Sequence, residues 1–224
     1  MLFSDALSWL PAAHPLFVHY DEDAGTRIEL SAVTFRNWVD KTANLLDDLG
    51  VGEGDDVQLD LITTHPGHWA TWVWVAAIWQ RAAVVTADRG VPTVMAAGSR
   101  PPTPGAIICS MHPLNLPVAE PPEDTTDFAE VLAQPDLHLA EPVGLTSPAW
   151  ATPAATLDHG QIAATAARTT AGVAHQPPGD WAGISQLLVA PVLGGGTTVS
   201  VTGGDGSTLE RILSQERGEL LHLP

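Results

Sequence analysis

Two hydroxyl side chains, Thr146 and Ser147, stand in a loop that leads towards a predicted helix. Enzymes often bind phosphate in such a setting, because a helix N-terminus offers N–H groups that have no partner within the helix. Asp158 and Gln161 have the spacing of a capping box, which predicts that the helix opens directly after Asp158. Residues 146–153 contain two prolines, which remove backbone donors, so this stretch is predicted to be irregular.

A working phosphate loop also needs glycines, which let the backbone approach the anion, and a lysine for its charge. Residues 146–153 contain neither. Lys41 is the only lysine in the chain, and it falls off the apolar face of a predicted helix, which indicates a solvated side chain. The central question is therefore whether the loop binds phosphate or is the remains of a loop that did.

Other groups of reactive side chains have simpler interpretations. His65 and His68, with His112 as a third candidate ligand, form a weak metal motif and are interpreted as surface histidines. Gly194–Gly196 has no lysine nearby and is interpreted as a tight turn. The chain has no Gly-x-Ser-x-Gly elbow for a hydrolase, and Cys109 lies in an apolar run that favours packing over reactivity.

Composition narrows the class of protein. Twenty-six acidic side chains against nine basic ones give a formal charge of −17, which disfavours a nucleic-acid groove or an anionic membrane surface. No apolar run is long enough to span a bilayer, and the N-terminus lacks the basic region of a signal peptide. A single cysteine excludes an internal disulfide, so we expect a cytoplasmic protein.

The periodicity of apolar residues predicts an α/β fold. Helical spacing predicts two helices, and the second is apolar nearly all round because it contains four tryptophans, so it should be buried on more than one side. Short apolar runs between turn residues predict buried strands. A strand, a crossover helix and a strand make a right-handed parallel unit, so we expect mainly parallel sheets covered by helices. The helices are predicted at 34–49 and 66–81, and the strands at 57–62, 83–86, 93–97 and 106–109.

The stretch TFRNWVDKTANLLDDLGVGEGDDVQLDL, followed by a helix and RAAVV, resembles the N-terminal region of the adenylate-forming superfamily. This superfamily contains the AMP-binding acyl-CoA synthetases, the adenylation domains of peptide synthetases and the luciferases. Leu49-Gly50-Val51, Gly54-Asp55 and Val57 match its pattern, and residues 187–201 resemble its helix, glycine turn and strand. These are structural residues, so they argue for the fold and not for activity.

The family loop reads Thr-Ser-Gly-Thr-Thr-Gly-x-Pro-Lys-Gly-Val and wraps the phosphates of ATP. This chain keeps Thr146, Ser147 and Pro153, and His159 follows where the family often has a histidine, with a one-residue slip. These four residues are the candidates for a degenerate phosphate loop, and ATP or AMP with Mg²⁺ is the ligand that the resemblance implies. No catalytic residue and no metal ligand is assigned. The family's glycines fall on Pro148, Ala151 and Ala155, and its lysine falls on Ala154.

The resemblance spans nearly all of residues 1–224, which we interpret as one truncated AMP-binding-like domain with a candidate subdivision near 140–160. It covers only about the first half of a family member. We favour a catalytically inactive relative that acts as a binding or partner module. One half of a split ligase and an enzyme of unrecognised chemistry remain alternatives. A truncated domain should leave an apolar face or a free strand edge, so a homodimer or a protein partner is expected.

Overall fold

The computed structural model describes residues 1–223, which form two compact units. The first unit comprises Met1–Arg36, His65–Trp72 and the residues from Ile162 onward. The second comprises Asn37–Thr64 and Val73–Gln161. Each unit is built from separate stretches of chain and is described by itself. No helix among residues 1–223 combines the length and the apolar character needed to cross a membrane.

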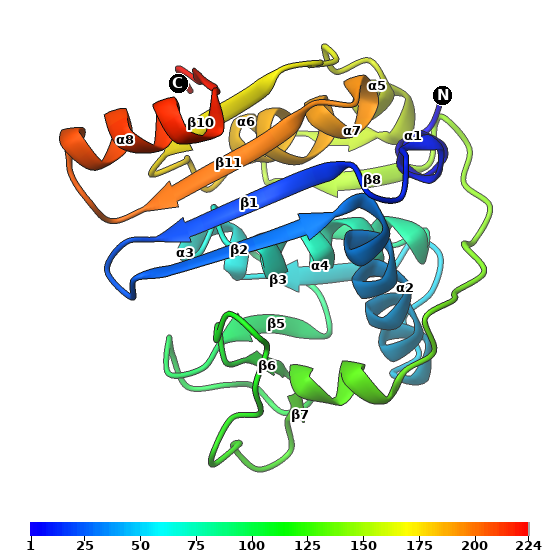
Figure 1. Ribbon diagram of the computed structural model, residues 1–224. Coiled ribbons are helices and arrows are strands. Elements are labelled where there is room, and N and C mark those ends of the chain that lie inside the picture. Colours follow the sequence, from blue (N-terminus) through cyan, green and yellow to red (C-terminus); the bar gives the residue numbers. More distant parts are fainter. Residues whose placement is uncertain (224) are drawn as a thin grey trace. The chain divides into compact units, whose positions relative to one another are not determined.

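The first unit contains a five-stranded sheet in the order β12-β10-β11-β1-β2 (Figure 1). All neighbouring strands are parallel except β1 and β2, which form an antiparallel hairpin. The buried run Leu16–Tyr20 explains why β1 is central, since a strand covered on both faces is apolar throughout. The strands are β1 (Pro15–Asp21), β2 (Thr26–Ser31), β10 (Ala171–His175), β11 (Thr197–Thr202) and β12 (Glu219–Leu220).

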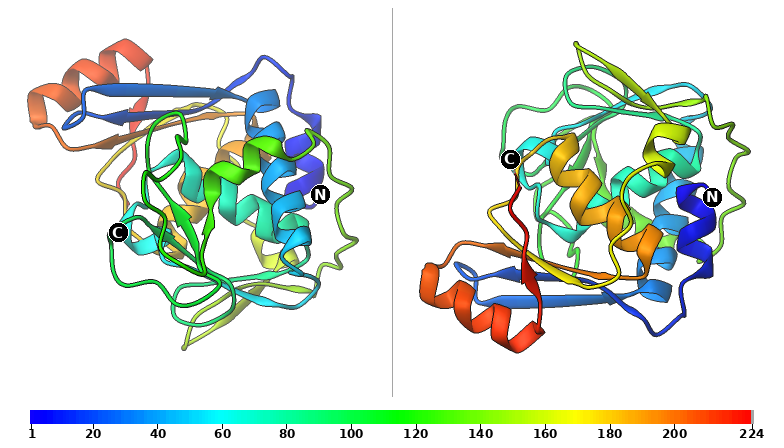
Figure 2. Two further views of the ribbon diagram at one scale, coloured as in Figure 1. Left: turned by 90° about the horizontal axis from the view of Figure 1, so that it is seen from below. Right: turned by 90° about the horizontal axis from the view of Figure 1, so that it is seen from above.

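Helices lie on both faces of this sheet: Figure 2 shows α8 on one side of the strands, and α6 and α7 on the other. Asp205 begins α8 by accepting the N–H of Thr208 at 3.0 Å. Asp180 caps α6 through the N–H of Gly183 in the same way. The helical elements are α1 (Phe3–Trp9), α6 (Trp181–Ile184), the π-helical turn η2 (Ser185–Val189), α7 (Ala190–Gly194) and α8 (Gly206–Glu216).

A proline, Pro191, lies just after the π-helical turn η2. Ala190 donates its N–H to the carbonyl of Ser185, five residues back. Pro191 has no N–H, so it cannot bond the carbonyl of Leu187, four residues back, or that of Gln186, five residues back. The carbonyls of Leu187 and Gln186 therefore receive no N–H from position 191, and donors outside the helix can satisfy them.

Arg168 and Thr198 supply the missing donors. The Thr198 hydroxyl donates to the Leu187 carbonyl at 2.7 Å, and Nη2 of Arg168 donates to the Gln186 carbonyl at 3.0 Å. Arg168 also donates to the Thr198 hydroxyl at 2.6 Å and to the Thr197 carbonyl at 2.6 Å. Burial lowers the pKa of Arg168 to about 10. This guanidinium therefore joins the helical layer to the sheet through neutral acceptors.

The second unit contains a seven-stranded sheet in the order β7-β6-β5-β3-β4-β8-β9, parallel except for the β8–β9 pair. Together with the first sheet, this confirms the predicted α/β fold with mainly parallel strands. Its strands are β3 (Asp56–Leu59), β4 (Val84–Thr86), β5 (Thr93–Ala96), β6 (Ile107–Cys109), β7 (Thr126–Asp127), β8 (Pro148–Ala151) and β9 (Thr156–Asp158). The helices are α2 (Ala32–Asp48), α3 (Leu61–Thr64), α4 (Trp69–Gln80), η1 (Phe128–Ala133) and α5 (His159–Ala163), of which α2, α4 and α5 also extend into the first unit.

The tryptophan-rich helix α4 is buried on all sides, as its sequence predicts. Its tryptophans are at most a few per cent exposed, and in the second unit Trp74 packs against Phe128 with ring centroids 4.8 Å apart. The helix begins at Trp69, three residues later than predicted. The preceding strand also ends early, at Leu59, because Leu61–Thr64 form a helical turn.

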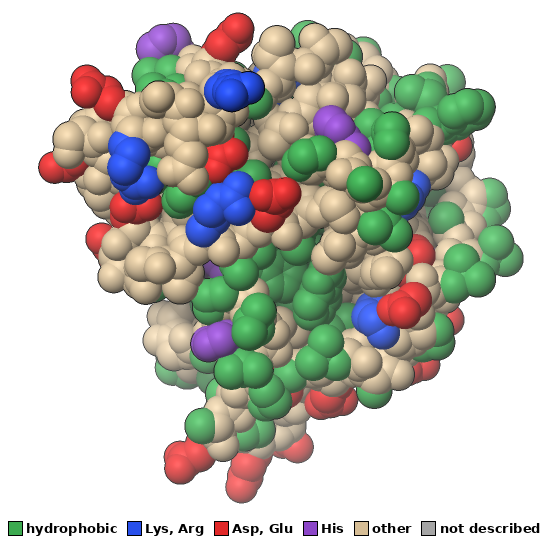
Figure 3. Space-filling view, viewed as in Figure 1, with side chains coloured by type: hydrophobic (Ala, Val, Ile, Leu, Met, Phe, Trp, Pro, Cys, Tyr) green, Lys and Arg blue, Asp and Glu red, His purple; other side chains and the backbone are tan. Residues whose placement is uncertain are grey.

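An irregular segment, residues 134–145, crosses the surface of the second unit beside α2, at the right-hand edge of Figure 1. We call this segment the strap. It contains no helix or strand before the turn at Leu145, and its leucines are exposed. Hydrophobic side chains are visible along the same edge in Figure 3.

Candidate functional site

Thr146, Ser147, Pro153 and His159 all lie in the second unit, around the β8–β9 hairpin. The expectation that residues 146–153 are irregular is wrong, because Pro148–Ala151 form strand β8, parallel to β4 and antiparallel to β9. Pro148 is tolerated as the first residue of the strand, and Pro153 lies in the turn between the two strands. The prolines therefore mark the ends of a strand.

The turn that joins β8 to β9 satisfies its own donors. The N–H of Thr152 donates to the carbonyl of Ala155 at 2.8 Å, and the N–H of Ala155 donates to the Thr152 hydroxyl at 3.1 Å. Pro153 has no N–H. Of the four residues of this turn, only Ala154 keeps an amide that another molecule could use. A triphosphate needs several convergent N–H groups, and this turn does not offer them.

The residues that flank the hairpin are also engaged. The Ser147 hydroxyl accepts the N–H of Gly144 at 3.1 Å, and the Ser147 carbonyl accepts the N–H of His159 at 3.1 Å. Gly160 donates its N–H to the carbonyl of Leu145 at 2.7 Å. The first amides of α5 are therefore bonded to the chain itself, and the exposed Thr146 lies in the turn between them and the strand.

The predicted capping box of α5 is present. Gln161 donates its N–H to the Asp158 carboxylate at 2.8 Å, and Asp158 donates its N–H to the Gln161 side chain at 2.9 Å. His159 is 3% exposed, its ring contacts Trp79, and its Nε2 has no hydrogen-bond partner among the described protein atoms. Burial lowers the pKa of His159, and the Asp158 carboxylate opposes this shift. A buried, neutral imidazole does not supply positive charge to a phosphate.

The only lysine is committed elsewhere in the second unit. Lys41 forms an ion pair with Asp136 at 3.0 Å and donates to the carbonyl of Gln134. The expectation that Lys41 is a solvated side chain is therefore wrong. Sequence periodicity could place it off the apolar face of α2, but it could not show that the strap passes over that position.

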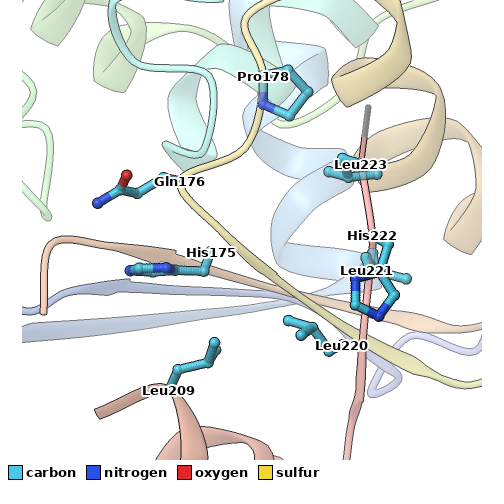
Figure 4. A pocket seen from close by; sticks show the side chains of 8 residues that line it. All are labelled: His175, Gln176, Pro178, Leu209, Leu220, Leu221, His222 and Leu223. Carbon is cyan, nitrogen blue, oxygen red and sulfur yellow. The ribbon is translucent and has the colours of Figure 1, made fainter. Parts of the chain in front are cut away.

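A pocket of about 360 Å³ lies in the first unit, at the carboxyl ends of β10 and β12. Figure 4 shows Leu209 of α8 below it, Pro178 above it and the segment from Leu220 on one side. Ligands of open α/β sheets commonly bind beyond the carboxyl ends of the strands. The lining residues include no carboxylate, although the chain carries a charge of −17: they are His175, Gln176, Pro178, Leu209 and Leu220–Leu223.

Sequence reasoning missed this pocket. Its polar residues follow the apolar run Gly172–Ala174 at the end of a strand, and that position was the available signal. The backbone of Gln176 has a φ of +47°, which is uncommon for a residue with a side chain. Such conformations often occur beside binding sites, which adds to the case for this strand end.

Three histidines of the first unit lie close together without forming a metal site. The rings of His19 and His68 are 5.0 Å apart, and those of His65 and His68 are 6.5 Å apart. No group of three metal-ligating side chains among residues 1–223 is arranged to hold an ion. Nδ1 of His19 bonds the Ser200 hydroxyl at 2.9 Å, and that hydroxyl donates to the carbonyl of Gly67. Burial lowers the pKa of His19 to about 4, so this histidine is neutral and structural.

Gly194–Gly196 is a tight turn, as predicted. Gly195 ends α7 with a φ of +72°, the left-handed conformation that favours glycine. A Cβ on Gly194 or Gly196 would lie 2.3 Å or 2.4 Å from the carbonyl oxygen of Arg168. The three glycines are therefore explained by chain reversal and close backbone contact, and they do not require a phosphate ligand.

Comparison with known proteins identifies relatives of this chain. No protein-family model matches it. A protein of Mycobacterium tuberculosis described as a "TIGR03089 family protein" is 30% identical, over 91% of this chain and 89% of that protein.

Solved structures share the fold. An acyl-CoA synthetase of Brucella canis matches with a TM-score of 0.75 and 16% identity, over 98% of this chain and 47% of its own. A benzoate CoA ligase of Burkholderia xenovorans gives 0.70 and 14%, over 97% and 49%. The N-terminal domain of FACL13 from Mycobacterium tuberculosis gives 0.67 and 15%, over 96% and 60%. The chain spans about half the length of the two ligases, which confirms the predicted resemblance to an N-terminal half.

Proposed function

Since the chain belongs to the TIGR03089 family and has the fold of an acyl-CoA synthetase N-terminal region, we propose that it is a binding module that does not adenylate a substrate by itself. One observation carries the proposal: in the turn between β8 and β9 the N–H groups of Thr152 and Ala155 bond acceptors within the turn, and only the N–H of Ala154 remains available to a ligand. Phosphoryl and adenylyl transfer depend on positioned charge and donors around the phosphates. This hairpin supplies neither, and the surplus of carboxylates over basic side chains opposes an anionic nucleotide.

The ligand of such a module would occupy the strand-end pocket of the first unit. Its leucines suit an apolar body, and the imidazole of His222 with the amide of Gln176 suits a polar or anionic end, whereas Nε2 of His175 already bonds the carbonyl of Gly203 at 3.1 Å. The related structures include acyl-CoA and benzoate CoA ligases. We therefore propose a small carboxylic acid with an aliphatic or aromatic body as the class of ligand.

The decisive test is calorimetric titration of the purified chain with MgATP, AMP and benzoate in separate experiments. We expect no saturable heat from either nucleotide. We expect benzoate to bind, and to lose its binding in a Leu220→Asp variant but not in a Leu116→Asp control, since Leu116 is exposed and lies outside the pocket.

Saturable MgATP binding with a dissociation constant below about 1 mM would contradict the proposal if Ser147→Ala or Thr152→Ala weakened it. That result would favour the alternative of a split ligase, completed by a second chain. Absence of both nucleotide and benzoate binding would leave the hairpin argument standing and would remove the assignment of the ligand.

A further inference from the structure

The strap presents leucines to solvent instead of burying them. Leu137 is 79% exposed, Leu139 is 90% exposed, and Leu145 at its end is also exposed. Single exposed leucines are common on protein surfaces, but several along one short segment are a mark of an interaction site. The question is whether the strap needs these side chains for its own structure.

Polar contacts alone account for the position of the strap. Nδ2 of Asn44 donates to the carbonyls of Pro135 and Leu137, both at 3.1 Å, and Oδ1 of Asn44 lies 2.7 Å from Nδ1 of His138. The N–H of Glu141 donates to the carbonyl of Gln80 at 3.0 Å. These bonds tie the strap to α2 and α4, so the outward leucines are not required to hold it in place.

Charges on the two sides of the strap are separated. The cations that hold it lie underneath, where the side chain of Arg81 is 8% exposed and that of Lys41 is 20% exposed. Their carboxylate partners face solvent: Asp136 is 66% exposed, and Asp47 and Glu141 are also exposed. A molecule that approaches this surface therefore meets leucine side chains and carboxylate oxygens, with the balancing positive charge buried below.

We propose that the strap is a docking surface for a protein partner that presents a basic amphipathic helix. Apolar side chains of such a helix would cover Leu137 and Leu139, and its lysines or arginines would meet the carboxylates at the rim. A second copy of this chain is a poorer occupant, because each copy carries a formal charge of −17. An anionic membrane is disfavoured for the same reason. This inference does not depend on the strand-end pocket or its ligand.

The test uses a synthetic helical peptide with leucines on one face and lysines on the other, labelled for fluorescence anisotropy. We expect saturable binding to the wild-type chain. We expect a loss of at least about tenfold in affinity for a Leu137→Ser/Leu139→Ser variant, because truncation of central apolar contacts has effects of this size. The matched control is Leu114→Ser/Leu116→Ser, which changes two leucines that are also exposed but lie in another loop of the same unit and should leave affinity unchanged.

Two further measurements separate the other occupants. A peptide with serine in place of leucine should bind weakly and equally to all variants, through charge alone. Equal affinity of the leucine peptide for both double variants would overturn the proposal. A dimer in sedimentation that the Leu137→Ser/Leu139→Ser variant dissociates would assign the strap to a second copy. Binding to phosphatidylserine vesicles that is lost in the same variant would assign it to a membrane, and either result would also overturn the proposal.

Discussion

Replacement of Thr198 by valine should reveal how much the hydrogen bonds of its hydroxyl with Leu187 and Arg168 contribute to stability. Valine has nearly the shape of threonine and suits a strand, so Thr198→Val removes a hydroxyl from a fully buried position with little change in packing. The carbonyl of Leu187 then loses its donor at 2.7 Å, and Arg168 loses an acceptor at 2.6 Å.

The magnitude follows from the partners that are left behind. An unsatisfied buried carbonyl costs about 1–3 kcal/mol, and a hydrogen bond to a charged group contributes about 1.5–3 kcal/mol. These two effects share one hydroxyl, so we expect a loss of about 2–4 kcal/mol in the free energy of unfolding. Urea denaturation followed by both tryptophan fluorescence and circular dichroism measures it, provided that the two transitions coincide. Thr202→Val, at the exposed end of the same strand, is the control and should change stability by less than about 0.5 kcal/mol.

A double-mutant cycle tests the cause. Pro191→Ala restores an N–H four residues after Leu187, so the helix can satisfy that carbonyl by itself. In the Thr198→Val background, Pro191→Ala should recover about 1–2 kcal/mol, and in the wild-type background it should recover much less. The Thr198 hydroxyl is assigned as the replacement for the N–H that position 191 lacks. A cost of under about 0.5 kcal/mol for Thr198→Val, or an equal effect of Pro191→Ala in both backgrounds, would refute this assignment.

Three other outcomes follow from the structure. Gly172→Ala should destabilise the chain by about 1–3 kcal/mol, because its Cβ would lie 2.4 Å from Nη1 of Arg168, whereas Gly206→Ala meets no atom within 4 Å and should be tolerated in urea denaturation. The pKa of His19 is lowered from 6.5 to about 4. Between these pH values His19 is protonated in the unfolded state and neutral in the folded state. Stability should therefore fall with acid by up to about 1.4 kcal/mol per pH unit, and urea titrations at several pH values should show a smaller dependence in His19→Asn. Burial raises the pKa of Cys109, so its thiol should react with a disulfide reagent only after unfolding, and rapid reaction of the native chain would show that the site opens.

The sequence predicts the main elements because their periodicity is strong. The apolar face of α2, the fully apolar α4 and the short runs at β4, β5 and β6 each follow from one pattern, and the structure contains all of them. Boundaries were less accurate. The hydroxyl of Ser31 accepts the N–H of Thr34 at 3.3 Å, and α2 begins at Ala32, earlier than the predicted start at residue 34. A cap depends on which of several nearby hydroxyl groups faces the first turn, and sequence alone does not decide that.

At the candidate site, the sequence predicts the residues better than it predicts their secondary structure. The sequence identifies Thr146, Ser147, Pro153 and His159 and the absence of glycine and lysine, but it predicts an irregular loop where a strand begins at Pro148. The error arises because proline is excluded from the middle of a strand but is tolerated as its first residue. The only sequence signal for the strand-end pocket is that its polar residues follow a strand, because the lining comes from three separate segments that the fold brings together.

The interleaving of the two units also constrains how the chain can be made. Strand β1 has β11 as its parallel neighbour, with Phe17 opposite Thr198, so this early strand can pair only with β2 until β11 has been made. The second unit needs residues only as far as Gln161 and can close first. During synthesis the apolar run Leu16–Tyr20 is therefore without its parallel partner until Thr197–Thr202 have left the ribosome. We expect a dependence on chaperones that bind exposed apolar strands, and a higher yield when translation is slowed by cooling.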